Sequence, residues 1–236
     1  MDEMEKMYIV EKQKIVFTAI GQACGREYLA LLFAKSIRDM GGKAAYVDGK
    51  GLESGKAMLY YKLSSCKGFN DFSFKDFGEA LKNDRPINQI NSYFEGINWA
   101  IKKEREQDKL SDCELLSIIN NIKGSYVVVS SDRPAVIKDA NVIVAVIDPL
   151  PWKIKGNMKK LEEIKKLELY GHKVIWLVNK YNRGINKKIL DKNLKVGRYF
   201  KVDFIESETV YNEAFKSSFL AKKCDIFLPE IFEKMG

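Results

Sequence analysis

The residues best suited to chemistry stand in a short turn near the amino end, between an apolar run at Lys14–Ile20 and a helical pattern that ends at Gly41. The turn consists of Gly21, Gln22, Ala23, Cys24, Gly25, Arg26, Glu27 and Tyr28. Small residues in a strand-to-helix turn let backbone N–H groups converge, and these groups together with the helix N-terminus attract phosphate. The position of the turn therefore predicts a phosphate-binding loop.

The residue types in this turn depart from those of an ATP-hydrolysing loop. Such a loop places Lys and then Ser or Thr after its second glycine, where they contact the β- and γ-phosphates and the magnesium ion. Arg26 partly replaces the lysine, but Glu27 puts a carboxylate where a small hydroxyl belongs. A tight connection in any doubly wound fold has the same outline, so the turn alone does not assign a function.

The cysteines and the single histidine give no further site. Cys24, Cys66, Cys113 and Cys224 lie far apart without a CxxC pair, which argues against a zinc or iron–sulfur site within one chain. We therefore predict reduced thiols and no metal site. A nucleophilic pair of Cys24 and His172 lacks a third orienting group, so we predict no catalytic residues.

The turn must be positioned by strands and helices, and both have clear patterns. Apolar runs typical of strands buried on both faces are Lys14–Ile20, Lys43–Asp48, Ser125–Ser130, Asn141–Asp148 and His172–Val178. Helical patterns lie between them, over 27–40, after a capping box of Ser111 and Glu114, and over 157–170, and each ends near a glycine. The alternation predicts an α/β domain with a mostly parallel central sheet.

We predict a single domain over residues 1–236, because no Pro-, Gly- or Ser-rich linker divides the chain. Residues from about 65 to 109 are polar and aromatic and interrupt the alternation. We expect this insertion-like region to supply a strand or two and a long helix.

The chain is basic, with 40 Lys and Arg against 32 Asp and Glu, a net charge of +8. Between Lys180 and Lys201, eight basic residues face only Asp191. This segment could attract DNA or an anionic membrane, or it is a solvated helix and loop.

With no signal-peptide or membrane-span pattern, we predict a cytoplasmic protein and leave open a peripheral position at the inner face of the membrane. We expect the tail at 225–235 to dock on the domain.

The order of these pieces resembles the ParA/MinD group of P-loop ATPases, including its CpaE/TadZ pilus-localisation branch. The similarity covers roughly residues 14–219, and its pieces after the turn are LALLFAKSIRDMGG, KAAYVDGKG, YVVVSSDRP, NVIVAVIDPLP, VIWLVNKYN and FKVDFIESETVYNEAF. The resemblance implies a three-layer, P-loop NTPase-like (Rossmann-like) fold with a mostly parallel central sheet.

The resemblance also implies roles for single positions. Asp48 matches the first switch aspartate, and Lys50 occupies the place of the second, which orients the attacking water. The magnesium-shell (Walker B) aspartate falls on Ser130, with Asp132 as the alternative after a shift of register. Asn179 matches the residue that faces the adenine.

A further departure is Gly21, which stands where the group has an extra signature lysine. Since one charge contact of this kind is worth ~10³-fold in rate or more, the combined losses predict little hydrolysis. We therefore predict a degenerate ParA/MinD-like protein of spatial organisation, serving a pilus or secretion apparatus or a DNA cargo. ATP or ADP is the expected ligand, bound weakly, and the missing hydroxyl argues against strong magnesium binding.

The same resemblance implies a protein partner and a homodimer, because relatives dimerise around ATP. Two other functions stay open. One is an active ATP-hydrolysing partition ATPase in which Arg26 and Lys50 supply the missing charges. The other is a Rossmann-like subunit of a redox complex.

Overall fold

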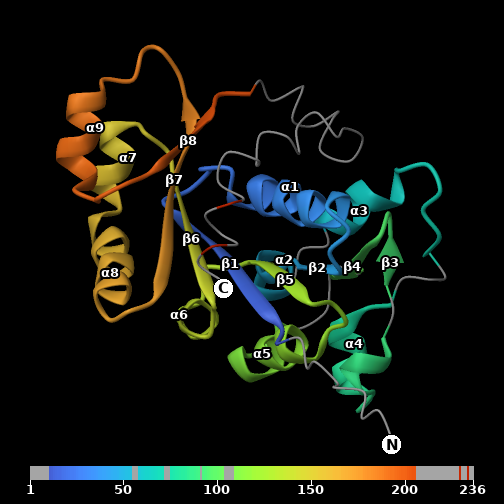
Figure 1. Cartoon of the computed structure of the whole chain (residues 1–236). Helices are drawn as coiled ribbons and strands as arrows, with labels where there is room; N and C mark the ends of the chain where they lie inside the picture. Colours follow the sequence, from blue (N-terminus) through green and yellow to red (C-terminus); the bar gives the residue numbers. More distant parts are fainter. Residues whose placement is uncertain are drawn as a thin grey trace, which may run out of the picture.

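The computed structural model describes residues 11–54, 58–71, 75–90, 92–103 and 109–205, together with Pro229 and Glu233. Within these residues a sheet lies between two layers of helices (Figure 1). The strand order is β3-β4-β2-β5-β1-β6-β7-β8, and every pairing is parallel except that of β3 with β4. The strands are β1 (Gln13–Ile20), β2 (Ala44–Val47), β3 (Tyr93–Phe94), β4 (Ile97–Ala100), β5 (Tyr126–Ser130), β6 (Val142–Ile147), β7 (Lys173–Tyr181) and β8 (Phe200–Asp203).

Both faces of the central strands are buried, as the continuous apolar runs predict. In β1, Ile15 and Phe17 pack into one core cluster, whereas Val16 and Ile20 pack into the other. The first cluster includes side chains of α1 (Arg26–Asp39) and α3 (Met58–Ser64). The second is covered by α2 (Gly49–Ser54), α4 (Phe77–Lys82), α5 (Asp112–Asn121), α6 (Pro134–Lys138), α7 (Pro151–Gly156), α8 (Met158–Leu169) and α9 (Lys187–Leu194). The predicted three-layer α/β architecture is confirmed.

Helix ends follow the sequence signals. After α1, Gly41 has a φ of +83° and its N–H donates to the Arg38 carbonyl at 2.8 Å. At the start of α5, the Glu114 N–H donates to Ser111 Oγ, and the Ser111 N–H donates to the Glu114 carboxylate at 2.7 Å. The predicted capping box is therefore present. Such caps fix the residues at which each helix begins or ends.

The insertion-like region agrees with its prediction in part. Its described residues form the hairpin β3–β4, which supplies the expected strands, after the short helix α4 and the 3₁₀ helix η2 (Ile87–Gln89). Glu95 and Gly96 both have positive φ values, +48° and +76°, which suit a tight hairpin turn. Trp99 is buried, and its Nε1–H donates to the Phe94 carbonyl at 3.0 Å. The turn and this cross-strand bond favour the two strands. Within the described part of this region the α-helix α4 spans only Phe77–Lys82, so the expected long helix is not found there.

Among the helices that the structure describes, none has the length and apolar character needed to cross a membrane. The tail at 225–235 lies outside the described residues apart from Pro229 and Glu233, so its docking stays a prediction.

Candidate functional site

The turn that joins β1 to α1 lies at the carboxyl edge of the sheet. Strand β1 has β5 on one side and β6 on the other, so the strand order reverses here, and doubly wound sheets bind ligands at such a point. Gly21, Ala23 and Gly25 have positive φ values of 100°, 54° and 85°. Helix α1 begins after Gly25 without a side-chain cap. The Arg26 and Glu27 N–H groups already face the Cys24 thiol and the Glu27 carboxylate, so an anion would compete for these first donors of the helix.

Side chains from β7 hold the turn in this conformation. Asn179 Nδ2–H donates to the Cys24 carbonyl at 2.8 Å, and Lys180 Nζ donates to the Ala23 carbonyl at 2.6 Å. A Cβ on Gly25 would lie 2.4 Å from Asn179 Nδ2, so only glycine fits there. Asn179, which the resemblance places at the adenine, thus donates its amide to the backbone of the turn.

Asn157 lies close to the start of the turn, with its side-chain amide donating to the Lys153 carbonyl. A Cβ on Gly21 would lie 2.7 Å from Asn157 Nδ2, which follows α7. The same edge carries Asp148, which is buried, with its Oδ2 2.7 Å from Lys153 Nζ and 3.7 Å from Lys180 Nζ. Pro151 is the first residue of α7, a position where proline is favoured.

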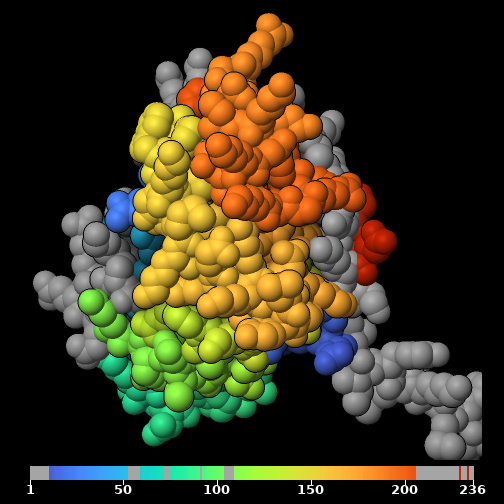
Figure 2. Space-filling view, turned by 90° about the vertical axis from the view of Figure 1, so that its left-hand side faces the viewer, coloured from blue at the N-terminus to red at the C-terminus, as the bar shows by residue number. Residues whose placement is uncertain are grey.

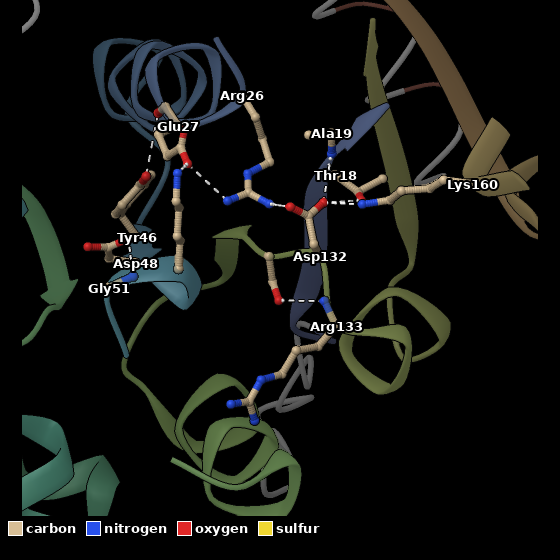
Figure 3. A network of polar contacts seen from close by, with 12 residues as sticks. Thr18, Ala19, Arg26, Glu27, Tyr46, Asp48, Gly51, Asp132, Arg133 and Lys160 are labelled. Carbon is tan, nitrogen blue, oxygen red and sulfur yellow. Dashed lines mark hydrogen bonds and ion pairs between the residues drawn. The ribbon is translucent and has the colours of Figure 1, made fainter. Parts of the chain in front are cut away.

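Arg26 is buried, and its guanidinium lies between two carboxylates (Figure 3). Nη2 donates to Glu27 Oε1 at 3.0 Å, and Nη1 forms an ion pair with Asp132 Oδ2. Burial lowers the pKa of Arg26, but the charges of Asp132 and Glu27 raise it further, so the group stays a cation. Its Nε has no hydrogen-bond acceptor within the described part of the chain.

Glu27 follows at the first turn of α1 and exposes 42% of its side chain. Its Oε1 lies 3.2 Å from Lys50 Nζ as well as close to Arg26. Burial raises the pKa of Glu27, but Arg26, its own backbone amide and Lys50 together bring it below the ordinary value. The side chain is therefore a carboxylate anion beside the turn, where phosphate would meet its repulsion.

Asp132 forms the other end of the network. Its Oδ1 accepts from Thr18 Oγ1 and from the Ala19 N–H, each at 2.9 Å, and forms an ion pair with Lys160 of α8 (Figure 3). Burial opposes ionisation, but Arg26 and Lys160 hold the pKa of Asp132 at about 2. Asp132 is the alternative position that the sequence gave for the magnesium-shell aspartate. In the structure its carboxylate lies next to Arg26.

The other position offered for this aspartate is Ser130. It is fully buried at the last residue of β5, whereas Asp132 forms the ion pair with Arg26. Asp48 is also buried, at the end of β2, and its Oδ1 accepts from the Gly51 N–H at 3.0 Å. The structure therefore brings Asp132, and not Ser130, to the charged group of the turn.

Sequence reasoning missed Lys160 and Thr18. Lys160 belongs to a stretch of alternating charges that reads as an exposed helix face, so only the packing of α8 reveals its partner. Cys24 is buried, and burial raises the pKa of its thiol to about 11. A neutral thiol at that position does not act as a nucleophile at neutral pH.

No protein-family model matches the sequence, and no curated protein matches it. Solved structures do. A Borrelia burgdorferi chain assigned to plasmid partition and bound to AMPPNP has a TM-score of 0.67 at 15% identity, covering 95% of this chain and 99% of its own. MinD of Pyrococcus horikoshii, in complex with Mg-ADP, has a TM-score of 0.63 at 13% identity, covering 95% and 98%.

A third similar structure is the MinC–MinD cell division complex of Aquifex aeolicus, with a TM-score of 0.62 at 14% identity and 86% of each chain covered. Identities this low establish the fold and leave activity open. The strand order around the β1–α1 turn and these similarities agree: this chain has the fold of ParA/MinD-type P-loop ATPases, as the sequence resemblance predicts.

Proposed function

We propose that this chain is a degenerate ParA/MinD-like protein that acts in spatial organisation or localisation, with weak nucleotide binding and little hydrolysis. The cargo class that we infer is a pilus or secretion apparatus, or DNA. The observation that carries the proposal is the arrangement of Arg26, which takes the lysine position but is held by Glu27 and Asp132. A cation engaged in this way is poorly placed to stabilise a transferring phosphoryl group.

Retained binding is supported by the turn itself. Its positive φ values and the uncapped start of α1 keep the backbone geometry that attracts phosphate. The structurally similar chains include one bound to AMPPNP and one bound to Mg-ADP. We infer ATP or ADP as the ligand, contacted by residues Gly21 to Tyr28.

A turnover assay with the purified chain tests the proposal. We expect ATP hydrolysis near the background rate, and Arg26→Ala should change it little. Rates of about 1 s⁻¹ or more, abolished by Arg26→Ala, would contradict degeneracy. They would favour the active ATPase, in which Arg26 and Lys50 supply the missing charges; both contact Glu27.

Calorimetry with ATP, ADP and NAD(P) distinguishes our proposal from the remaining alternative, a Rossmann-like subunit of a redox complex. Dinucleotide binding would support a redox subunit, for which the similar structures described above give no support. Adenine nucleotide binding without dinucleotide binding would exclude it. Weak ATP or ADP binding together with slow turnover is the result that our proposal requires.

Partners are inferred from two features. MinD in the similar complex is bound to MinC, which supports a protein partner here, and we infer a homodimer from the resemblance. The basic segment between Lys180 and Lys201 includes α9 and the start of β8, which lie with α7 and α8 on one face (Figure 2, yellow to orange). We propose that this face attracts DNA or an anionic membrane through its charge.

A further inference from the structure

Asp132 stands just after β5, where P-loop ATPases hold magnesium through an aspartate. Both of its oxygens already have partners in this chain. Oδ2 faces Arg26, and Oδ1 faces Lys160 and accepts from Thr18 and Ala19. A divalent cation beside either oxygen would lie against a guanidinium or an ammonium group. The surroundings of Asp132 therefore do not fit a magnesium ion.

The second position needed for magnesium fits no better. Glu27 replaces the hydroxyl that would bind the metal, and its Oε1 lies 3.0 Å from Arg26 Nη2 and 3.2 Å from Lys50 Nζ. Across the described residues, no group of three or more His, Cys, Asp or Glu side chains is arranged to hold a metal ion. Both carboxylates nearest the turn are thus neutralised by side chains.

The charges of these ion pairs give the site an excess of positive charge. One ion-paired chain consists, in order, of Lys160, Asp132, Arg26, Glu27 and Lys50. Its three cations and two carboxylates leave one positive charge. A second ion-paired group beside the turn consists of Lys153, Asp148 and Lys180. Its two cations and one carboxylate leave a second positive charge. The two ion-paired groups together therefore carry a net charge of +2, that of one divalent cation.

We propose that Arg26 and Lys160 take the place of the divalent cation in this site, so that the site binds nucleotide phosphate without a metal. Arg26 retains a buried Nε–H donor that has no acceptor in the described residues, and this donor can serve a ligand oxygen. Lys160 is a positioning residue, because it holds Asp132 against Arg26 from the far side. The inference rests on the nucleotide binding proposed above, and it names what replaces magnesium there.

Calorimetric titration with ADP, in EDTA and again with excess magnesium chloride, tests the inference. We expect dissociation constants that agree within about threefold between the two conditions. Lys160→Gln should weaken ADP binding in EDTA by about tenfold, the order expected for losing a charge-assisted contact. The control is Lys159→Gln, an exposed neighbour on α8, which should leave both constants unchanged.

A positioning role also predicts a change that loss of stability would not cause. Once Lys160→Gln releases Asp132 Oδ1, magnesium should tighten ADP binding in that variant, whereas Lys160→Arg should keep the wild-type independence from metal. An unchanged response to magnesium in Lys160→Gln would overturn the role of Lys160.

The wild-type titrations separate the two proposals. Binding that is absent in EDTA and restored by magnesium would overturn metal independence and leave the proposed nucleotide binding intact. No heat in either condition would overturn nucleotide binding and this inference with it.

Discussion

At the scale of single residues, Glu27 sets how much negative charge a phosphate meets at the turn. Its carboxylate is ionised and bound to Arg26 and Lys50, so a ligand phosphate must compete with it for the same cations. We expect Glu27→Thr to strengthen ADP binding by about tenfold, because it removes one like charge and releases two cations. Calorimetry measures the change.

The matched control for this variant is Glu163→Gln, which removes an exposed carboxylate from α8. It should leave ADP binding unaltered. If Glu27→Thr bound ADP no better than the wild-type chain, Glu27 would not be competing with phosphate.

Asp132 gives a prediction on pH. Because Arg26 and Lys160 lower its folded pKa to about 2, its contribution to stability is present above the unfolded pKa of about 4. That contribution is lost as pH falls from about 4 through 2. Asp132→Asn should lower the free energy of unfolding by about 1–3 kcal/mol at neutral pH, because buried Arg26 loses a charged partner.

Urea unfolding from pH 2 to pH 7 checks this expectation. The gap between wild type and Asp132→Asn should be constant at pH 5–7 and should narrow below about pH 4. A gap that stayed constant down to pH 2 would show that the charge of Asp132 adds nothing to stability.

At the scale of elements, the turn depends on β7 as much as on its own residues. Gly25 combines a φ of +85° with a Cβ position only 2.4 Å from Asn179 Nδ2. We expect Gly25→Ala to lower the free energy of unfolding by about 1–3 kcal/mol, because alanine is strained at this φ and displaces Asn179 from Cys24. Chemical denaturation measures the change.

Gly156→Ala is the control, because a Cβ there meets nothing within 4 Å and Gly156 lies in α7. It should be neutral or slightly stabilising. The double variant Gly25→Ala/Asn179→Ala separates the two causes, since it removes the collision but keeps the strained φ. Equal stability of Gly25→Ala and Gly156→Ala would contradict the view that the close contact of Gly25 with Asn179 stabilises the turn.

Elements were predictable from sequence where the signal is local. Runs such as Val142–Ile147 predict a strand because burial on both faces leaves no polar position, and Ser111 predicts a helix start because its cap lies within one turn. The strands of the insertion-like region were expected, but the place of the hairpin at Glu95–Gly96 was not, because only one glycine marks its turn. Glutamate is not a residue type that indicates a positive φ, so the conformation of Glu95 could not be predicted from sequence.

The site was predictable only in part, for a related reason. The turn and Arg26 follow from residue order, because strand, turn and helix are contiguous. The contact of Asp132 with Lys160 joins residues on different elements, and the engagement of Asn179 with the Cys24 carbonyl spans most of the chain. Such contacts depend on how α8 and β7 pack, which the pattern of a single segment does not contain.

At the scale of the whole molecule, the charge is unevenly spread. The net charge is +8, and the segment from Lys180 to Lys201 carries nearly all of it. The exposed lysines of α9 are Lys187, Lys188 and Lys192. They lie apart from the ion-paired network, so charge changes there should alter binding to a polyanion and leave ADP binding unchanged.

We expect the chain to bind duplex DNA with an affinity that falls as salt rises. The triple reversal Lys187→Glu/Lys188→Glu/Lys192→Glu should reduce the slope of log affinity against log salt by roughly 2–3, since each phosphate contact contributes about 0.9. Fluorescence anisotropy with a labelled duplex measures this slope. The reversal Lys43→Glu/Lys67→Glu/Lys138→Glu makes the same change in net charge at exposed lysines outside α7, α8 and α9, and should alter the slope by less than 1. Equal losses from both triple variants would mean that DNA responds to total charge, and that α9 is only a solvated helix.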